Sequence, residues 1–157
     1  MPEVQKSKNR IVIPSSQDYL VEVDRFLETR LKEAGMNESD LADVAISVSE
    51  AVNNAIFHGN KCDLKKKITV RVKVESGTVE VQVEDQGRGF DPSEIPNPVE
   101  GDNLLKQVGR GIFIIKSLMD RLDFSFAPEG GTILKMYKSF QTTRRSSSPE
   151  AGLPLAE

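Results

Sequence analysis

The sequence contains few of the residues that build disulfides and metal clusters. Its 157 residues include one cysteine, one histidine and no tryptophan. A single cysteine cannot form an internal disulfide and fits a reducing compartment, so we expect a cytoplasmic protein. A single histidine likewise excludes a catalytic triad or a metal cluster built on histidines within the chain.

Long apolar segments and an excess of positive charge are also missing. No apolar run approaches the roughly 20 residues of a membrane helix, and the charged N-terminus has no apolar signal segment, so we expect neither membrane insertion nor secretion. The formal charge of −3 gives no broad basic field, which argues against nucleic acid as a direct partner. A Walker-type loop, Gly-x4-Gly-Lys-Ser/Thr, is absent, which excludes P-loop nucleotide chemistry.

The apolar residues that are present follow two periods, which together predict an α+β domain. With 38% hydrophobic residues, the chain has enough apolar surface for one core. Helical spacing predicts a first helix that begins after Ser15 or Ser16 and ends at Gly35. A second helix is expected to begin at Asn37 or Ser39.

The other period is two, which is typical of half-buried strands. Apolar residues alternate with polar ones over 68–74 and again over 79–83, which predicts a β-hairpin that turns at Ser76-Gly77. Pro14 has no N–H and so fits the end of a strand over 10–13. The remaining expected elements are a helix over 111–122 and strands over 122–126 and 132–137.

Two stretches show no sustained periodicity. Residues 91–108 lie between two glycine-rich motifs, and a loop of this length in a compact domain is commonly functional or disordered, so we interpret them as a lid over a ligand. From residue 139 on, the stretch 142–149 begins a region with almost no apolar content until Leu153, which predicts a disordered tail over 139–157. The sequence therefore predicts one domain over 1–138.

Glu50 and Asn54 are the first candidate functional residues. They are four residues apart on the second predicted helix, so their side chains project from one face. An asparagine oxygen suits Mg²⁺, which prefers oxygen ligands and is commonly shared with substrate phosphates. Glu50, one turn away, could then orient or deprotonate a hydroxyl or water. Taken alone, the two residues fit an ordinary solvated helix face equally well.

The stretch Asp85-Gln-Gly-Arg-Gly-Phe-Asp91 follows the second strand of the hairpin. A carboxylate at Asp85 can accept a hydrogen bond from the exocyclic amine of adenine. Gly87 and Gly89 allow the backbone to approach a base or phosphates without a Cβ clash. The alternative is a simple strand-ending turn.

Gly109-Arg110-Gly111 is expected to open a helix, whose free N–H groups and dipole favour phosphate. Arg110 could add a charge-assisted contact, although a flexible loop with one exposed arginine is an equal alternative. Thr132 follows Gly130-Gly131, where a hairpin turn is slightly favoured over a hydroxyl contact to a base.

Three motifs in this order resemble the nucleotide-binding boxes of the GHKL superfamily. Glu50-Ala-Val-Asn-Asn-Ala-Ile-Phe-His-Gly59 is similar to its N box, Asp85–Asp91 to its G1 box and Gly109-Arg-Gly-Ile-Phe-Ile-Ile115 to its G2 box. The resemblance covers roughly 11–138. It implies the Bergerat fold, a layered α/β sandwich in which helices cover a mixed, mostly antiparallel sheet.

The resemblance also implies a role for each matching residue. Glu50 would be the catalytic base, and Asn54 would bind Mg²⁺ next to ATP. The remaining implied nucleotide contacts are Asp85 with Gly87 and Gly89 at the adenine, Gly109, Arg110 and Gly111 at the phosphates, and Thr132 near the base.

Within that superfamily the chain most resembles the anti-sigma factor type of serine/threonine kinase, the RsbW family. This implies transfer of the ATP γ-phosphate to a STAS-domain anti-anti-sigma factor, and in many members a homodimer that sequesters a sigma factor. We expect no phosphoacceptor-histidine domain ahead of the motifs, which would separate the chain from sensor histidine kinases. Two alternatives stay open: an ATP-gated binding protein that does not phosphorylate, and an ATPase- or chaperone-type fragment.

Overall fold

The computed structural model describes residues 3–87 and 103–141, and their side chains except those of 103–108. Its strands come in antiparallel pairs separated by helices, which confirms the expected α+β class. In chain order they are β1 (Gln5–Lys6), β2 (Arg10–Pro14), the 3₁₀ turn η1 (Gln17–Tyr19), α1 (Leu20–Glu33), α2 (Glu38–Asn54), the π turn η2 (Ala55–Gly59), β3 (Lys67–Glu75), β4 (Thr78–Glu84), α3 (Asn103–Leu118), β5 (Arg121–Phe126) and β6 (Thr132–Ser139).

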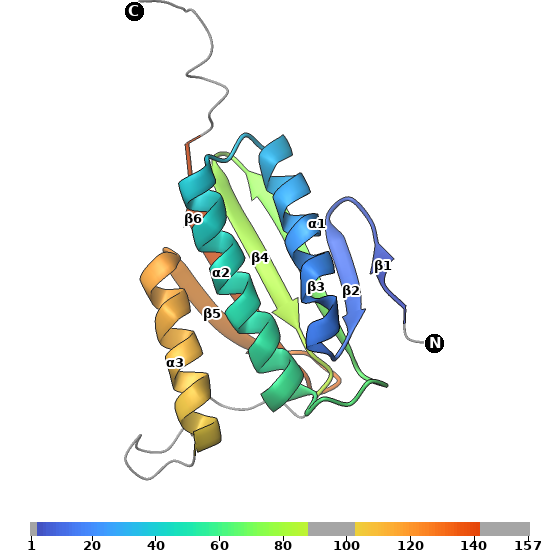
Figure 1. The fold of residues 1–157 in the computed structure, drawn as a ribbon. Helices are drawn as coiled ribbons and strands as arrows, with labels where there is room; N and C mark the ends of the chain where they lie inside the picture. The colour runs from blue at the N-terminus through green and yellow to red at the C-terminus, as the bar shows by residue number, and fades with distance from the viewer. Residues whose placement is uncertain (1–2, 88–102, 142–157) are drawn as a thin grey trace, which may run out of the picture.

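The strands form a six-stranded sheet in the order β1-β2-β3-β4-β6-β5, and α1, α2 and α3 lie on one face of it (Figure 1). Every pair among the described strands is antiparallel, so the expectation of a mixed sheet was wrong. The reason is the position of β6. β4 and β5 run in the same direction on either side of it, and the β5–β6 hairpin inserts β6 between them.

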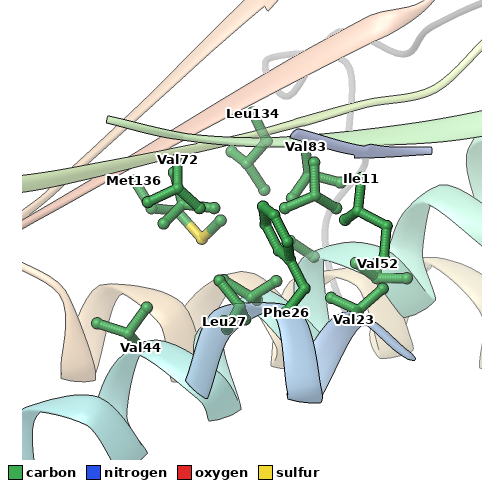
Figure 2. Packing of buried hydrophobic residues seen from close by; sticks show 14 of the residues in the cluster. Ile11, Val23, Phe26, Leu27, Val44, Val52, Val72, Val83, Leu134 and Met136 are labelled. Atoms are coloured by element: carbon green, nitrogen blue, oxygen red, sulfur yellow. The ribbon is translucent and has the colours of Figure 1, made fainter. Parts of the chain in front are cut away.

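The core lies between the sheet and the three helices. Strands β3 and β4 alternate buried and more exposed residues, as their period of two predicts. Phe26 and Leu27 of α1 point toward the inner face of the sheet (Figure 2). Fully buried members of the core include Ile11, Ile13, Leu27, Leu31, Val44, Val48, Val52, Ile56, Ile68, Val70, Val81, Ile115 and Met136.

The turns that connect these elements follow local chemistry. Ser76 and Gly77 both have positive φ, 51° and 76°, as a two-residue hairpin turn requires. Gly35 ends the first helical segment at φ 84°. The side chain of Asn37 caps α2 by accepting the N–H of Asp40 at 2.8 Å. These three sequence expectations are confirmed.

Other boundaries differ from expectation. Ser16 caps the short turn η1, through the N–H of Asp18, and α1 itself begins only at Leu20. The folded part reaches Phe140, which packs in the core and donates its N–H to Gly77 O at 2.9 Å, so it extends beyond the boundary expected at 138. Residues 142–157, the rest of the expected tail, lie outside the described residues. None of the described helices has the length and apolar character needed to cross a membrane.

Leu27 offers a test of this core. It is 0% exposed on α1, so Leu27→Ala should remove packing and leave a cavity that lowers the free energy of unfolding by about 2–5 kcal/mol. Val21 on the same helix is 51% exposed, and Val21→Ala should change it by less than about 0.5 kcal/mol. Urea unfolding followed by circular dichroism measures both, and equal effects would contradict the packing described here.

Candidate functional site

The candidate residues gather at one end of the sheet, where α2 and β4 end and β6 begins (Figure 1). Because β4 and β6 are antiparallel neighbours, the residue after β4 lies opposite the first residue of β6. The N–H of Asp85 accordingly donates to Thr132 O at 3.0 Å. Two residues that are 47 positions apart in the chain therefore lie side by side.

Asp85 is a buried carboxylate, only 4% exposed. Its Oδ1 accepts two backbone N–H groups, from Gly87 and from Thr132, each at 3.0 Å. Burial raises the pKa of Asp85 above its ordinary value, and the two amide hydrogen bonds oppose this rise only in part. Among the described residues none donates a hydrogen bond to Oδ2, so this oxygen is available to a donor on a ligand.

Glycines surround this carboxylate because the backbone approaches it too closely for a side chain. A Cβ on Gly59 would collide with Oδ2 of Asp85, and a Cβ on Gly131 would collide with the carbonyl oxygen of Asp85. Gly87 packs in the same way against the carbonyl of Gly59. Of these, Gly87 was predicted as part of the site, whereas Gly59 and Gly131 were missed.

The position of Gly59 results from a change of helix type at the end of α2. After Asn54 the chain continues as the π turn η2, and the N–H of Asn60 closes it by donating to Ala55 O at 2.7 Å. π turns are rare and are found mostly within helices at functional sites. Here the wider turn places Gly59 against the carboxylate of Asp85.

Glu50 and Asn54 lie on the side of α2 that faces α3. A Cβ on Gly111 of α3 would lie 3.2 Å from Oε1 of Glu50 and 3.3 Å from Nδ2 of Asn54. Gly111 therefore leaves these two side chains the space they occupy. Nδ2 of Asn54 is buried and has no hydrogen-bond partner within the described part of the chain.

A small cavity is lined both by Asp85 and Thr132 and by Asn54. Its volume is about 20 Å³, so a purine ring would have to widen it. The hydroxyl of Thr132 is buried and unpartnered among the described residues, as expected of a group that serves a ligand. The cavity is lined by Ala51, Asn54, Ala55, Val83, Asp85, Phe124, Thr132 and Leu134.

The expectation that Gly109-Arg110-Gly111 opens a helix was wrong. α3 begins at Asn103, so these residues lie inside it, and residues 103–108 of the expected lid are helical. The reason is that Asn103-Leu-Leu-Lys-Gln-Val108 contains residues that tolerate a helix well, and the two glycines do not break it. The side chain of Arg110 is exposed, while Gly89 and the rest of the expected lid lie outside the described residues.

Metal binding by a cluster of acidic, histidine or cysteine side chains receives no support. The described residues contain no group of three or more such side chains that could hold an ion. A magnesium ion at Asn54 would therefore depend on few protein ligands, which is the usual arrangement when phosphates and water complete its coordination.

Two curated relatives are similar to this chain. The anti-sigma F factor of Clostridium perfringens is 31% identical over 105 residues, which cover 66% of this chain and 75% of that protein. The serine-protein kinase RsbW of Staphylococcus epidermidis is 29% identical over 133 residues, which cover 80% of this chain and 82% of that protein.

A solved structure and a family model are also similar to this chain. The crystal structure of the RsbU and RsbW domains of Rv1364c from Mycobacterium tuberculosis matches with a TM-score of 0.60 at 24% identity, over 83% of this chain. The chain spans only 32% of that structure, and the likeness concerns the fold. A model described as the histidine kinase-like ATPase domain matches residues 13–138. The protein therefore belongs to the histidine kinase-like ATPase domain family, the GHKL superfamily.

Proposed function

We propose that this chain is an ATP-dependent serine/threonine protein kinase and anti-sigma factor, which transfers the γ-phosphate of ATP to a STAS-domain anti-anti-sigma factor. The observation that carries the proposal is one cavity lined by both Asp85 and Asn54, with Glu50 one helical turn from Asn54. The names of the two curated relatives, a serine-protein kinase and an anti-sigma factor, support the same activity.

Adenine would bind at Asp85. Oδ2 of this residue would accept the N6 amine while Oδ1 stays bonded to the amides of Gly87 and Thr132. The buried hydroxyl of Thr132 would donate to a ring nitrogen or to a bound water. Gly87 would form one wall of this site, and Gly89 would continue it.

Magnesium would bind at Asn54. The residue fits this role because it lines the cavity and because an amide oxygen is a suitable ligand. The unpartnered atom of its buried amide is the nitrogen Nδ2, which donates hydrogen bonds and cannot itself bind a cation. When bound with ATP, the ion would neutralise charge on the phosphates and orient them. The amide oxygen and nitrogen would have to exchange places if Oδ1 does not already face the ion.

Glu50 would act as the general base. The oxygen of the acceptor serine or threonine forms a bond to the γ-phosphorus, the bond from that phosphorus to the bridging oxygen breaks, and ADP leaves. The hydroxyl proton passes to the carboxylate of Glu50, which α2 holds one turn from Asn54.

The phosphates would lie toward α3, near Gly109, Arg110 and Gly111. Arg110 is exposed and could supply a charge-assisted hydrogen bond. Inside a helix the N–H groups of the two glycines are already engaged, so their use for phosphate requires the first turns of α3 to unwind. Glycine lowers helix stability by about 1 kcal/mol relative to alanine, which makes such unwinding easier here.

The partners follow from the same family likeness. We propose that the chain acts as a homodimer, binds a STAS-domain protein and a sigma factor in turn, and carries this activity in one domain that ends near residue 140. The tail beyond it has no proposed role. A second candidate, an ATP-gated binding protein that does not phosphorylate, draws support from the relative that is named only as an anti-sigma factor.

Glu50→Gln tests the base. The amide cannot accept the hydroxyl proton, so transfer of labelled γ-phosphate from Mg-ATP to STAS-domain proteins should fall about 10²–10⁴-fold while the Kd for ATP changes little. Glu38→Gln makes the same chemical change at the exposed other end of α2 and should leave transfer unchanged. Transfer by Glu50→Gln within tenfold of the parent would contradict the role. A parent protein that binds ATP tightly but labels nothing would favour the second candidate.

The raised pKa of Asp85 predicts how binding depends on pH. The folded state holds the proton more tightly than the unfolded chain does, so the cost of the buried charge is fully present above the raised pKa and is relieved as pH falls through it. The ionised form is the one that accepts the adenine amine. Affinity for ADP should therefore fall about 10-fold or more as pH drops through this pKa.

Asp85→Asn is the matched control for this pH dependence. It mimics the protonated form at every pH, so its affinity should be low throughout, and the ratio of parent to variant affinity isolates Asp85 from the titration of the phosphates themselves. Calorimetric titration at several pH values measures both. Parallel curves for the two proteins would exclude Asp85 as the titrating group.

A further inference from the structure

Asn60, which directly follows the first motif, has no role in the function proposed above, yet its side chain is fully engaged. It is 1% exposed. Its Nδ2 donates to Oγ of Ser15 at 2.7 Å and to Lys67 O at 3.0 Å, and its Oδ1 accepts the N–H of Gln86 at 2.7 Å. Both amide hydrogens and the carbonyl oxygen therefore have partners.

These bonds connect segments that are distant in sequence. Ser15 follows β2, Lys67 begins β3 and Gln86 lies two residues past the end of β4. Ser15 is itself 1% exposed, and its hydroxyl donates to Lys66 O at 2.8 Å. Since the side chains of Asn60 and Ser15 are buried and fully bonded, removal of one leaves its partners unsatisfied and permits the segments to move apart.

Asn60 and Gln86, two members of this network, are each next in sequence to a residue of the candidate adenine site. Gly59, which precedes Asn60, contacts Oδ2 of Asp85, and Gln86, which Asn60 binds, directly follows Asp85. Gly87 packs on the carbonyl of Gly59. The bond from Asn60 to Gln86 thus joins the two backbone segments between which the carboxylate of Asp85 is held.

We propose that Asn60 is a positioning residue for Asp85, and through it sets affinity and selectivity for the adenine base. The inference rests on the function proposed above, because it gives Asp85 its ligand. Only a side-chain amide supplies two donors and one acceptor in this arrangement. Aspartate lacks the donors, and glutamine is one methylene longer than the space between the segments requires.

Asn60→Ala in the full-length chain tests this proposal against a matched asparagine. Asn37→Ala also removes two side-chain hydrogen bonds, those to Asp40, but at the opposite end of α2. Both variants should lower Tm. Asn60→Ala alone should weaken Mg-ATP binding about tenfold and reduce the preference for Mg-ATP over Mg-GTP, as expected for loss of one well-placed hydrogen bond. Turnover at saturating ATP should stay within about twofold, because Glu50 is undisturbed.

The outcomes separate three situations. An ATP-to-GTP preference equally unchanged in Asn60→Ala and Asn37→Ala overturns the proposal and leaves Asn60 a purely structural residue. A parent protein with no preference for ATP overturns the adenine role of Asp85 itself, and the present proposal with it. If Asn60→Ala does not fold, Ser15→Ala removes one acceptor of the Asn60 amide and should shift the preference in the same direction, by about threefold. An unshifted preference in Ser15→Ala then overturns the proposal.

Discussion

Two hydrogen bonds to one oxygen atom, Oδ1 of Asp85, connect the segments that form the site. Oδ1 of Asp85 accepts amides from Gly87, two residues later, and from Thr132 at the start of β6. It therefore fixes the turn after β4 and the first pair of the β4–β6 ladder at once. Burial of a carboxylate is costly, and these two amides offset part of that cost, while no described residue donates to the other oxygen. The glycines around it follow from the same close packing: a Cβ on Gly59 would collide with the carboxylate, and a Cβ on Gly87 or Gly131 would collide with a neighbouring backbone carbonyl.

The end of α2 and the turn that follows it supply further residues of the site. α2 carries Glu50 and Asn54 on its last turns, and the π turn that follows supplies Gly59. α3 is anchored far from the site: Lys138 donates to Leu118 O at 2.8 Å and lies 3.4 Å from Oδ2 of Asp43. Gly111, in the middle of α3, approaches Glu50 and Asn54. The end of α3 that Lys138 holds and the part that faces the site are thus distinct.

Sequence reasoning predicted those features that depend on local chemistry. The hairpin at Ser76-Gly77, the cap at Asn37 and the shared helix face of Glu50 and Asn54 each follow from a few neighbouring residues. Features that depend on distant segments were missed. Gly59 and Gly131 are needed only because they meet Asp85 in space, and the insertion of β6 between β4 and β5 leaves no trace in strand periodicity. The first turns of α3 were misassigned because two glycines suggested a helix start, whereas residues 103–108 tolerate a helix well and the helix runs through the glycines.

The position of the site at the junction of β4 and β6 has a consequence for biosynthesis. The pairings of β2 with β3 and of β3 with β4 are made within the first part of the chain, before Gln86. Asp85 accepts a hydrogen bond from Thr132, which is the last residue of the site to be synthesised. A chain interrupted before β6 would lack both the Thr132 amide and the Gly131 backbone that pack against Asp85. The candidate site is therefore complete only when synthesis of the domain is nearly finished, so a truncated product would bind a ligand there poorly.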